Sequence, residues 1–94
     1  MIKDEVIEKI EECGCFEEIE YPEENMVGKT FNVKTEPVTL IINKLTIGPV
    51  VSVDTIGVAL HIWINPYFLG FDLNEPILAV VVSYEEMDGF EVVV

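Results

Sequence analysis

The triplet Cys13-Gly14-Cys15 holds both cysteines of the chain, and thiols are common zinc ligands and redox groups. A closed zinc site needs four ligands, whereas one chain supplies two thiols and a distant histidine, His61. Two subunits could pool four thiolates. A helix that ends at Gly14 with a cysteine packed beneath it explains the same triplet, because a free cysteine packs as a small hydrophobic side chain. We therefore expect no metal and no cofactor, and keep Cys13 and Cys15 as the metal-ligand candidates.

His61 is the second group suited to chemistry, because an imidazole titrates near neutral pH. A general base needs a nucleophile or substrate within hydrogen-bond reach, and Ser52 and Ser83 stand in no catalytic motif. A histidine beside Trp63 in an apolar segment is typical of a core or interface position. We predict no catalytic residue, and a small enzyme that uses His61 or carboxylates is one alternative.

Carboxylates make up 18 of the 94 residues, so calcium binding and glycoside hydrolysis have to be considered. Residues 72–75 (Asp-Leu-Asn-Glu) begin like an EF-hand loop, but Pro76 takes the next ligand position and the required glycine is missing. Residues 85–89 indicate an acidic hairpin loop. A catalytic pair cannot be selected from so many acids without geometry. We expect most of them to be solvated.

The net charge is −13, from 18 acids and five lysines without any arginine. Binding to DNA or RNA needs a basic patch, so we expect no direct contact with nucleic acid. An acidic surface promotes solubility and attracts basic proteins. Because a dimer would carry −26 (twice −13), one alternative function is that of an acidic decoy, which occupies a basic, nucleic-acid-binding protein by imitating phosphate.

Length indicates a single domain over residues 1–94. The N-terminus has no basic-then-apolar signal peptide, and no apolar stretch approaches about 18 residues, so we expect a cytoplasmic protein without membrane contact. Glutamine is absent while Glu, Val and Ile are abundant, which leans toward a thermophile.

The expected elements begin with a helix over residues 2–13, in which Ile2, Val6 and Ile10 recur on one stripe. Asp4 is expected to cap its start, and Gly14 to end it in a left-handed conformation. The 25 valines and isoleucines favour β structure. A short extended segment over 16–21 and a turn at Gly48-Pro49 are expected. Five to six strands should lie within 27–34, 38–43, 50–53, 56–64, 77–84 and 90–94.

Residues 54–64 fit two elements, because periodicity does not separate an all-apolar strand from a buried helix that starts at Asp54. Branched side chains and Gly57 favour the strand. On that interpretation Val58, Leu60, Ile62 and Ile64 line one face, with Ala59, His61 and Trp63 on the other. Asn65-Pro66 should start one helical turn. The nearly all-apolar run 77–84 is typical of a central strand covered on both faces.

Several of these strands are apolar on both faces, and one helix covers only part of one face. A monomer would expose an apolar patch and open strand edges, which soluble proteins avoid. We therefore predict an α+β fold with one N-terminal helix and a mostly antiparallel sheet, completed by homodimerisation, so that the isolated subunit is unstable. The predicted interface residues are Val58, Leu60, Ile62, Val80, Val81, Val82 and Val92.

The length, the acidity and the Val/Ile-rich C-terminal half, as in residues 76–82 (Pro-Ile-Leu-Ala-Val-Val-Val), resemble small acidic orphan proteins of archaea. What this resemblance implies is an intertwined α+β homodimer without an assigned function. No motif accompanies it, so it implies no functional residue. The leading hypothesis is a non-enzymatic, homodimeric binding or structural protein.

Overall fold

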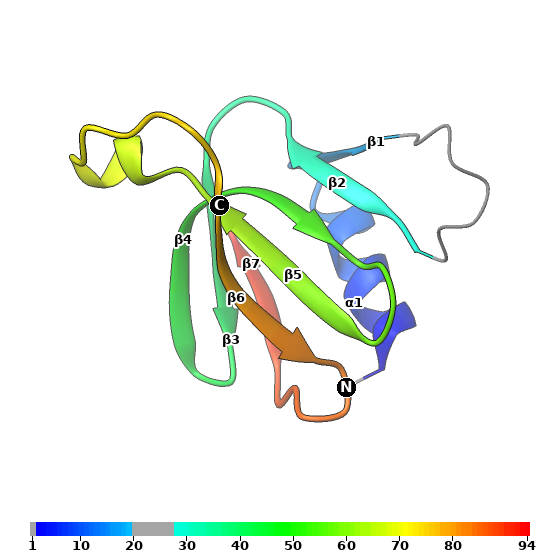
Figure 1. Cartoon of the computed structure of the whole chain (residues 1–94). Helices are drawn as coiled ribbons and strands as arrows, with labels where there is room; N and C mark the ends of the chain where they lie inside the picture. Colours follow the sequence, from blue (N-terminus) through cyan, green and yellow to red (C-terminus); the bar gives the residue numbers. More distant parts are fainter. Residues whose placement is uncertain (1, 20–27) are drawn as a thin grey trace.

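The computed structural model describes residues 2–19 and 28–94 and consists of a seven-stranded antiparallel sheet curled around one helix (Figure 1). The elements are α1 (Lys3–Glu12), β1 (Phe16–Ile19), β2 (Thr30–Val33), β3 (Val38–Ile42), β4 (Leu45–Asp54), β5 (Ala59–Ile64), the 3₁₀ helix η1 (Pro66–Leu69), β6 (Ile77–Ser83) and β7 (Phe90–Val93). The predicted α+β class is confirmed. The count of strands rises from the expected five or six to seven because the segment after α1 pairs as strand β1. The expectations for residues 20–27 lie outside the described residues.

Strand β4 organises the sheet, because three strands pair with it. Strands β2 and β3 lie end to end along one side of β4. Strand β2 pairs with the end of β4, where Thr30 is opposite Asp54, and β3 pairs with its start, where Ile42 is opposite Leu45. Strand β5 lies along the other side of β4, and β6 pairs with β5. Beyond β2 and β3 the sheet continues into β1 and β7, respectively. Residues 34–37 separate β2 from β3, so this side of the sheet divides into two branches.

The turn between β3 and β4 is formed by Asn43 and Lys44, which corrects the turn predicted at Gly48-Pro49. Asn43 and Lys44 have φ of 51° and 67°, and two consecutive positive φ values are what a type I′ hairpin turn requires. Strand β4 starts at Leu45, so Gly48 and Pro49 lie inside it; the peptide bond between them is cis. Glycine and proline are stronger turn signals than lysine, which explains the error.

Helix α1 packs against the concave side of the sheet. Ile2 holds the N-cap position without a side-chain hydrogen bond, so Asp4 lies in the first turn and is not the cap. Val6 and Ile10 have no exposed surface, as their shared stripe predicts. Gly14 ends the helix with φ of 76°, which confirms the left-handed terminator.

The hydrophobic core lies between α1 and the concave face and comes from one chain. Its buried members are Val6, Ile10, Phe16, Phe31, Val38, Leu40, Ile42, Val50, Val53, Leu60, Ile62, Tyr84, Met87 and Phe90. Because the sheet curls around the helix, ten residues of helix are enough to close this face. The sequence analysis expected one helix to cover only part of one face and the isolated subunit to be unstable. The core on this face is instead buried within a single chain, so the proposals below take the separated subunit to be folded.

Strand β6 is an edge strand, which corrects the central position predicted for residues 77–84. Among the described residues it pairs with β5 alone, and Ile77, Leu78 and Val81 are between 38% and 48% exposed. Strand β7 pairs with β3 and not with β6, so residues 85–89 connect two strands that are not paired with each other and form no hairpin loop. Asn43 holds this connection: its Nδ2 donates to the Glu86 carbonyl at 3.3 Å.

Candidate functional site

The connection between β5 and β6 extends beyond the sheet as an arm, residues 65–76 (Figure 1). Asn65 caps η1, because its Oδ1 accepts a hydrogen bond from the N–H of Tyr67 at 3.1 Å. The predicted helical turn is thereby confirmed. The Nδ2 of Asn65 also donates to Oδ1 of Asn74 at 2.9 Å. This second bond ties the start of the arm to its return.

Apolar side chains are concentrated on the arm and on β6. Of the 13 exposed large hydrophobic residues in the described part, eight fall between residues 67 and 81: Tyr67, Phe68, Leu69, Phe71, Leu73, Ile77, Leu78 and Val81. Their mean exposure is about one half, so at roughly 200 Å² per large side chain they present roughly 800 Å². The largest apolar patch of a typical monomer covers about 300–600 Å². A standard protein interface takes roughly 800 Å² from each partner.

The arm also encloses an open hollow of about 470 Å³. Its lining residues are Pro66, Phe71, Asp72, Leu73 and Ile77. Four of these five side chains are apolar. The hollow can therefore receive an apolar side chain from another molecule.

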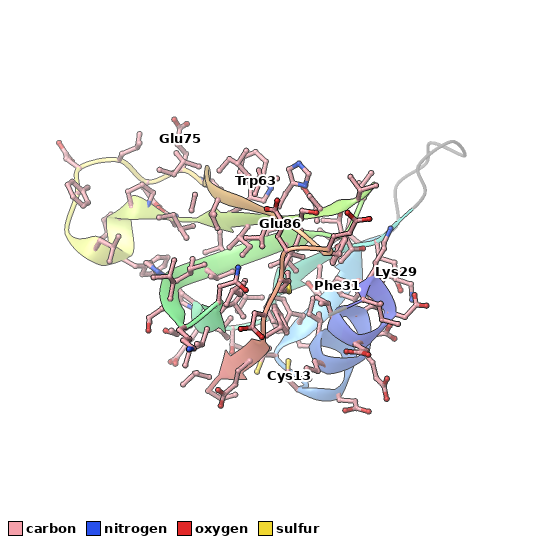
Figure 2. The ribbon with its side chains drawn as sticks, turned by 90° about the horizontal axis from the view of Figure 1, so that it is seen from below. Cys13, Lys29, Phe31, Trp63, Glu75 and Glu86 are labelled. Atoms are coloured by element: carbon pink, nitrogen blue, oxygen red, sulfur yellow. The ribbon has the colours of Figure 1, made fainter. Side chains whose placement is uncertain are left out.

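Two rows of side chains cross the outer face of the sheet, the face turned away from α1. The strand registers place Thr30, Asp54, His61 and Val81 in one row, and Asn32, Ser52, Trp63 and Leu78 in the next. Both rows run from polar side chains on β2 and β4 to apolar ones on β6. Asp54 accepts one hydrogen bond from Thr30 Oγ1 at 2.6 Å and another from Trp63 Nε1 at 3.0 Å. These bonds hold the indole on the outer face, where Figure 2 shows it.

His61 lies within β5, which confirms the strand interpretation of this segment over the helix. Asp54 is directly opposite it on β4, a pairing that no sequence signal indicated because it depends on the strand register. The His61 Nδ1 atom is buried without a hydrogen-bond partner among the described residues. Ser52 pairs with Trp63 and Ser83 with Ala59, so neither serine lies opposite His61. The described geometry therefore assembles no nucleophile with this histidine.

Cys13 and Cys15 lie at the end of α1. The Cys13 thiol donates to the Ile10 carbonyl at 3.1 Å and accepts from the N–H of Cys15 at 3.4 Å. Partial burial and the neighbouring Cys13 raise the pKa of the Cys15 thiol, and Lys34 opposes this shift. Within residues 2–19 and 28–94, no three His, Cys, Asp or Glu side chains are grouped as a metal site. The geometry is that of packed thiols.

Exposed carboxylates gather on the solvent side of α1 and on β1. They include Glu5, Glu8, Glu11, Glu12, Glu17 and Glu18. Lys29 Nζ lies 3.4 Å from a Glu11 oxygen and 3.9 Å from a Glu18 oxygen. These pairs are solvent-exposed, so each contributes at most about 1 kcal/mol. The surface of α1 and β1 thus keeps a strong negative charge.

The predicted interface residues separate into distinct environments. Leu60 and Ile62 have no exposed surface, because the chain's own core encloses them, so they offer nothing to a second chain. Val81 is exposed on the outer face, and Val58 is exposed in the turn before β5 rather than on the strand. Three others are partly buried and pack against the core: Val80, Val82 and Val92. The sequence analysis did not identify the arm as a binding surface. The aromatic residues after Pro66 could have indicated it, but they were interpreted only as part of a helical turn.

Comparison of the chain with protein-family models, curated proteins and solved structures gave no match in any of the three. In the described part of the chain, no helix has the length and apolar character needed to cross a membrane. Any statement about function therefore rests on the arm, the outer face and the acidic surface.

Proposed function

We propose that the protein is a cytoplasmic, non-enzymatic homodimer with a binding or structural role, and that its copies associate through the arm and β6. The observation that carries this proposal is the roughly 800 Å² of exposed apolar surface between residues 67 and 81. Summed over these side chains, the area is comparable to one partner's share of a standard interface.

A second copy is favoured by the apolar character of this surface and of β6, and not by charge. Residues 45–94 contain neither lysine nor arginine, so the surface has no fixed cation with which to pair an acidic protein. Strand β6 carries no charged side chain at all. An edge strand without charge is normally covered, and a second copy supplies an apolar surface of equal area.

Interfaces of this size have dissociation constants from micromolar to picomolar, depending on packing. We therefore expect dimers at micromolar protein concentration. Phe71→Asp should weaken the dimer strongly, because Phe71 is 63% exposed on the arm and lines its hollow. Leu45→Asp is the matched control: Leu45 is 67% exposed, but it lies at the turn between β3 and β4.

Size-exclusion chromatography with light scattering measures the mass of both variants. The proposal expects a folded monomer for Phe71→Asp and a dimer for Leu45→Asp. Equal masses for the two variants, with native circular dichroism, would contradict an interface on the arm. Wild-type protein that remains monomeric would point instead to a different partner for this surface.

A second candidate function is supported by the exposed carboxylates of α1 and β1. In this role the dimer acts as a decoy that occupies basic, nucleic-acid-binding proteins. Replacing Glu8 and Glu12 on α1 by glutamine should reduce such binding, whereas replacing Asp72 and Glu75 on the arm should not. Pull-downs at increasing salt test this, because a charge-driven contact is lost as ionic strength rises.

A further inference from the structure

A second copy can reach the arm and β6 in three ways. It can extend the sheet at the β6 edge, place its arm against the first arm, or cover the outer face of β5 and β6. The structure distinguishes these arrangements by the regularity of the edge, the position of the charges and the covering of each face.

The β6 edge is poorly suited to continue the sheet. The register between β5 and β6 shifts between Ile62 and Trp63, which pair with Val80 and Leu78, so Ala79 is left without a partner. An extra residue of this kind bends the strand and interrupts the hydrogen-bonding groups along it. Proteins use such bulges to prevent pairing between edge strands. The uninterrupted part of the β6 edge, which could pair with another strand, is limited to residues 80–83.

A symmetric contact between two arms is opposed by charge. Each arm carries Asp72 and Glu75 and no cationic side chain, so two arms would bring four carboxylates into one apolar contact. Desolvated like charges cost several kcal/mol. The outer face carries neither Asp72 nor Glu75, and its central side chains are His61 and Trp63 on β5.

The outer face of β5 and β6 is open and apolar at its edge. Helix α1 packs on the opposite face, and Leu78 and Val81 are 44% and 48% exposed beside Trp63 and His61. Figure 2 shows Glu75, on the return of the arm, on the same side of the sheet as Trp63 and away from α1. The arm therefore stands at the border of the outer face, beside the space that a second sheet stacked about 10 Å away would occupy.

We infer that the second copy lies face to face on this outer face, with each arm covering Trp63, Leu78 and Val81 of the partner subunit. This inference rests on the proposed homodimer and specifies its geometry. The contact is reciprocal, as a two-fold axis requires, so the arm of each copy serves as the covering layer of the other. It places the acidic arm near the other subunit's His61 instead of near a second arm.

Trp63 is the only tryptophan of the chain, so its fluorescence reports on this face alone. Acrylamide quenching is measured on the unmodified protein over a dilution series that spans dissociation, with the mass determined at each concentration. Covering the indole in the interface should lower the quenching constant of the dimer at least about twofold relative to the monomer, because a packed interface core excludes solvent. Phe71→Asp should show the monomer value at all concentrations, and Leu45→Asp the wild-type curve.

A dimer whose Trp63 is as accessible as in the monomer would overturn the face-to-face arrangement while leaving the homodimer intact. A protein that is monomeric throughout would overturn both. Leu78→Glu provides a second test that does not rely on fluorescence: it should raise the dissociation constant at least about tenfold, since it places a charge in a dry contact. Leu45→Glu is its control, and equal dissociation constants for the two variants would also refute the arrangement.

Discussion

Replacing Asp54 by alanine should lower the free energy of unfolding by about 2–4 kcal/mol, because two hydrogen-bond donors lose one shared acceptor. The Thr30 hydroxyl is in a residue that is only 3% exposed, so water cannot easily replace the carboxylate. The Trp63 indole is partly buried and loses its partner as well. Each unsatisfied buried donor costs about 1–3 kcal/mol, and the partial exposure of Trp63 limits its share.

Urea denaturation followed by circular dichroism measures this loss, at one fixed protein concentration because dimerisation shifts apparent stability. Asp54→Asn is the control: its amide can accept from the indole and donate to the Thr30 oxygen, so it should lose no more than about 1.5 kcal/mol. A double-mutant cycle with Thr30→Val should give a coupling of about 1–2 kcal/mol. A loss below about 0.5 kcal/mol for Asp54→Ala, or equal losses for alanine and asparagine, would refute this reasoning.

Four further outcomes are expected. Tyr84→Phe should leave stability unchanged or raise it by up to about 2 kcal/mol, because the buried hydroxyl has no hydrogen-bond partner among the described residues; a clear loss in urea denaturation would reveal a missing partner. Burial raises the pKa of Tyr84 from 10.0 to about 12, so its contribution to stability is intact below pH 10 and is lost as the pH rises through 12; tyrosinate absorbance during a pH titration checks this. The raised pKa of Cys15 should make it react with a disulfide reagent more slowly than free glutathione at pH 8, and faster reaction would argue for an activated thiol. Added salt should raise the melting temperature by screening the carboxylates of α1 and β1, whereas an unchanged or falling value would show that they are already paired.

Local patterns in the sequence were sufficient to predict the elements that depend on nearby residues. The spacing of Val6 and Ile10 identified the buried side of α1, and Gly14 identified its end. The alternation in β5 predicted that Leu60 and Trp63 lie on opposite faces of the strand, but it did not indicate which face is the core, and Leu60 was assigned to the interface. These features follow from the 3.6- and two-residue periods of helices and strands.

Features that depend on distant pairings were not predictable in this way. An apolar run such as residues 77–83 has the same sequence pattern in a central strand and in an edge strand. Its position at the edge is established by its pairing with β5 on one side. The crossing of β7 to β3 and the placement of Asp54 opposite His61 likewise depend on register. The curl of the sheet, which lets α1 close the core, has no local signal either. The candidate site was therefore only partly anticipated, through Val81.

The central claim is that two copies associate through the exposed apolar surface between residues 67 and 81. Sedimentation equilibrium of the unmodified protein over a range of micromolar concentrations tests it most directly. With a chain mass of 10.6 kDa, the account predicts 21.2 kDa (twice 10.6), and a shift toward the single-chain mass on dilution while the circular dichroism stays native. A mass of 10.6 kDa at every concentration, from a fully folded protein, would contradict it.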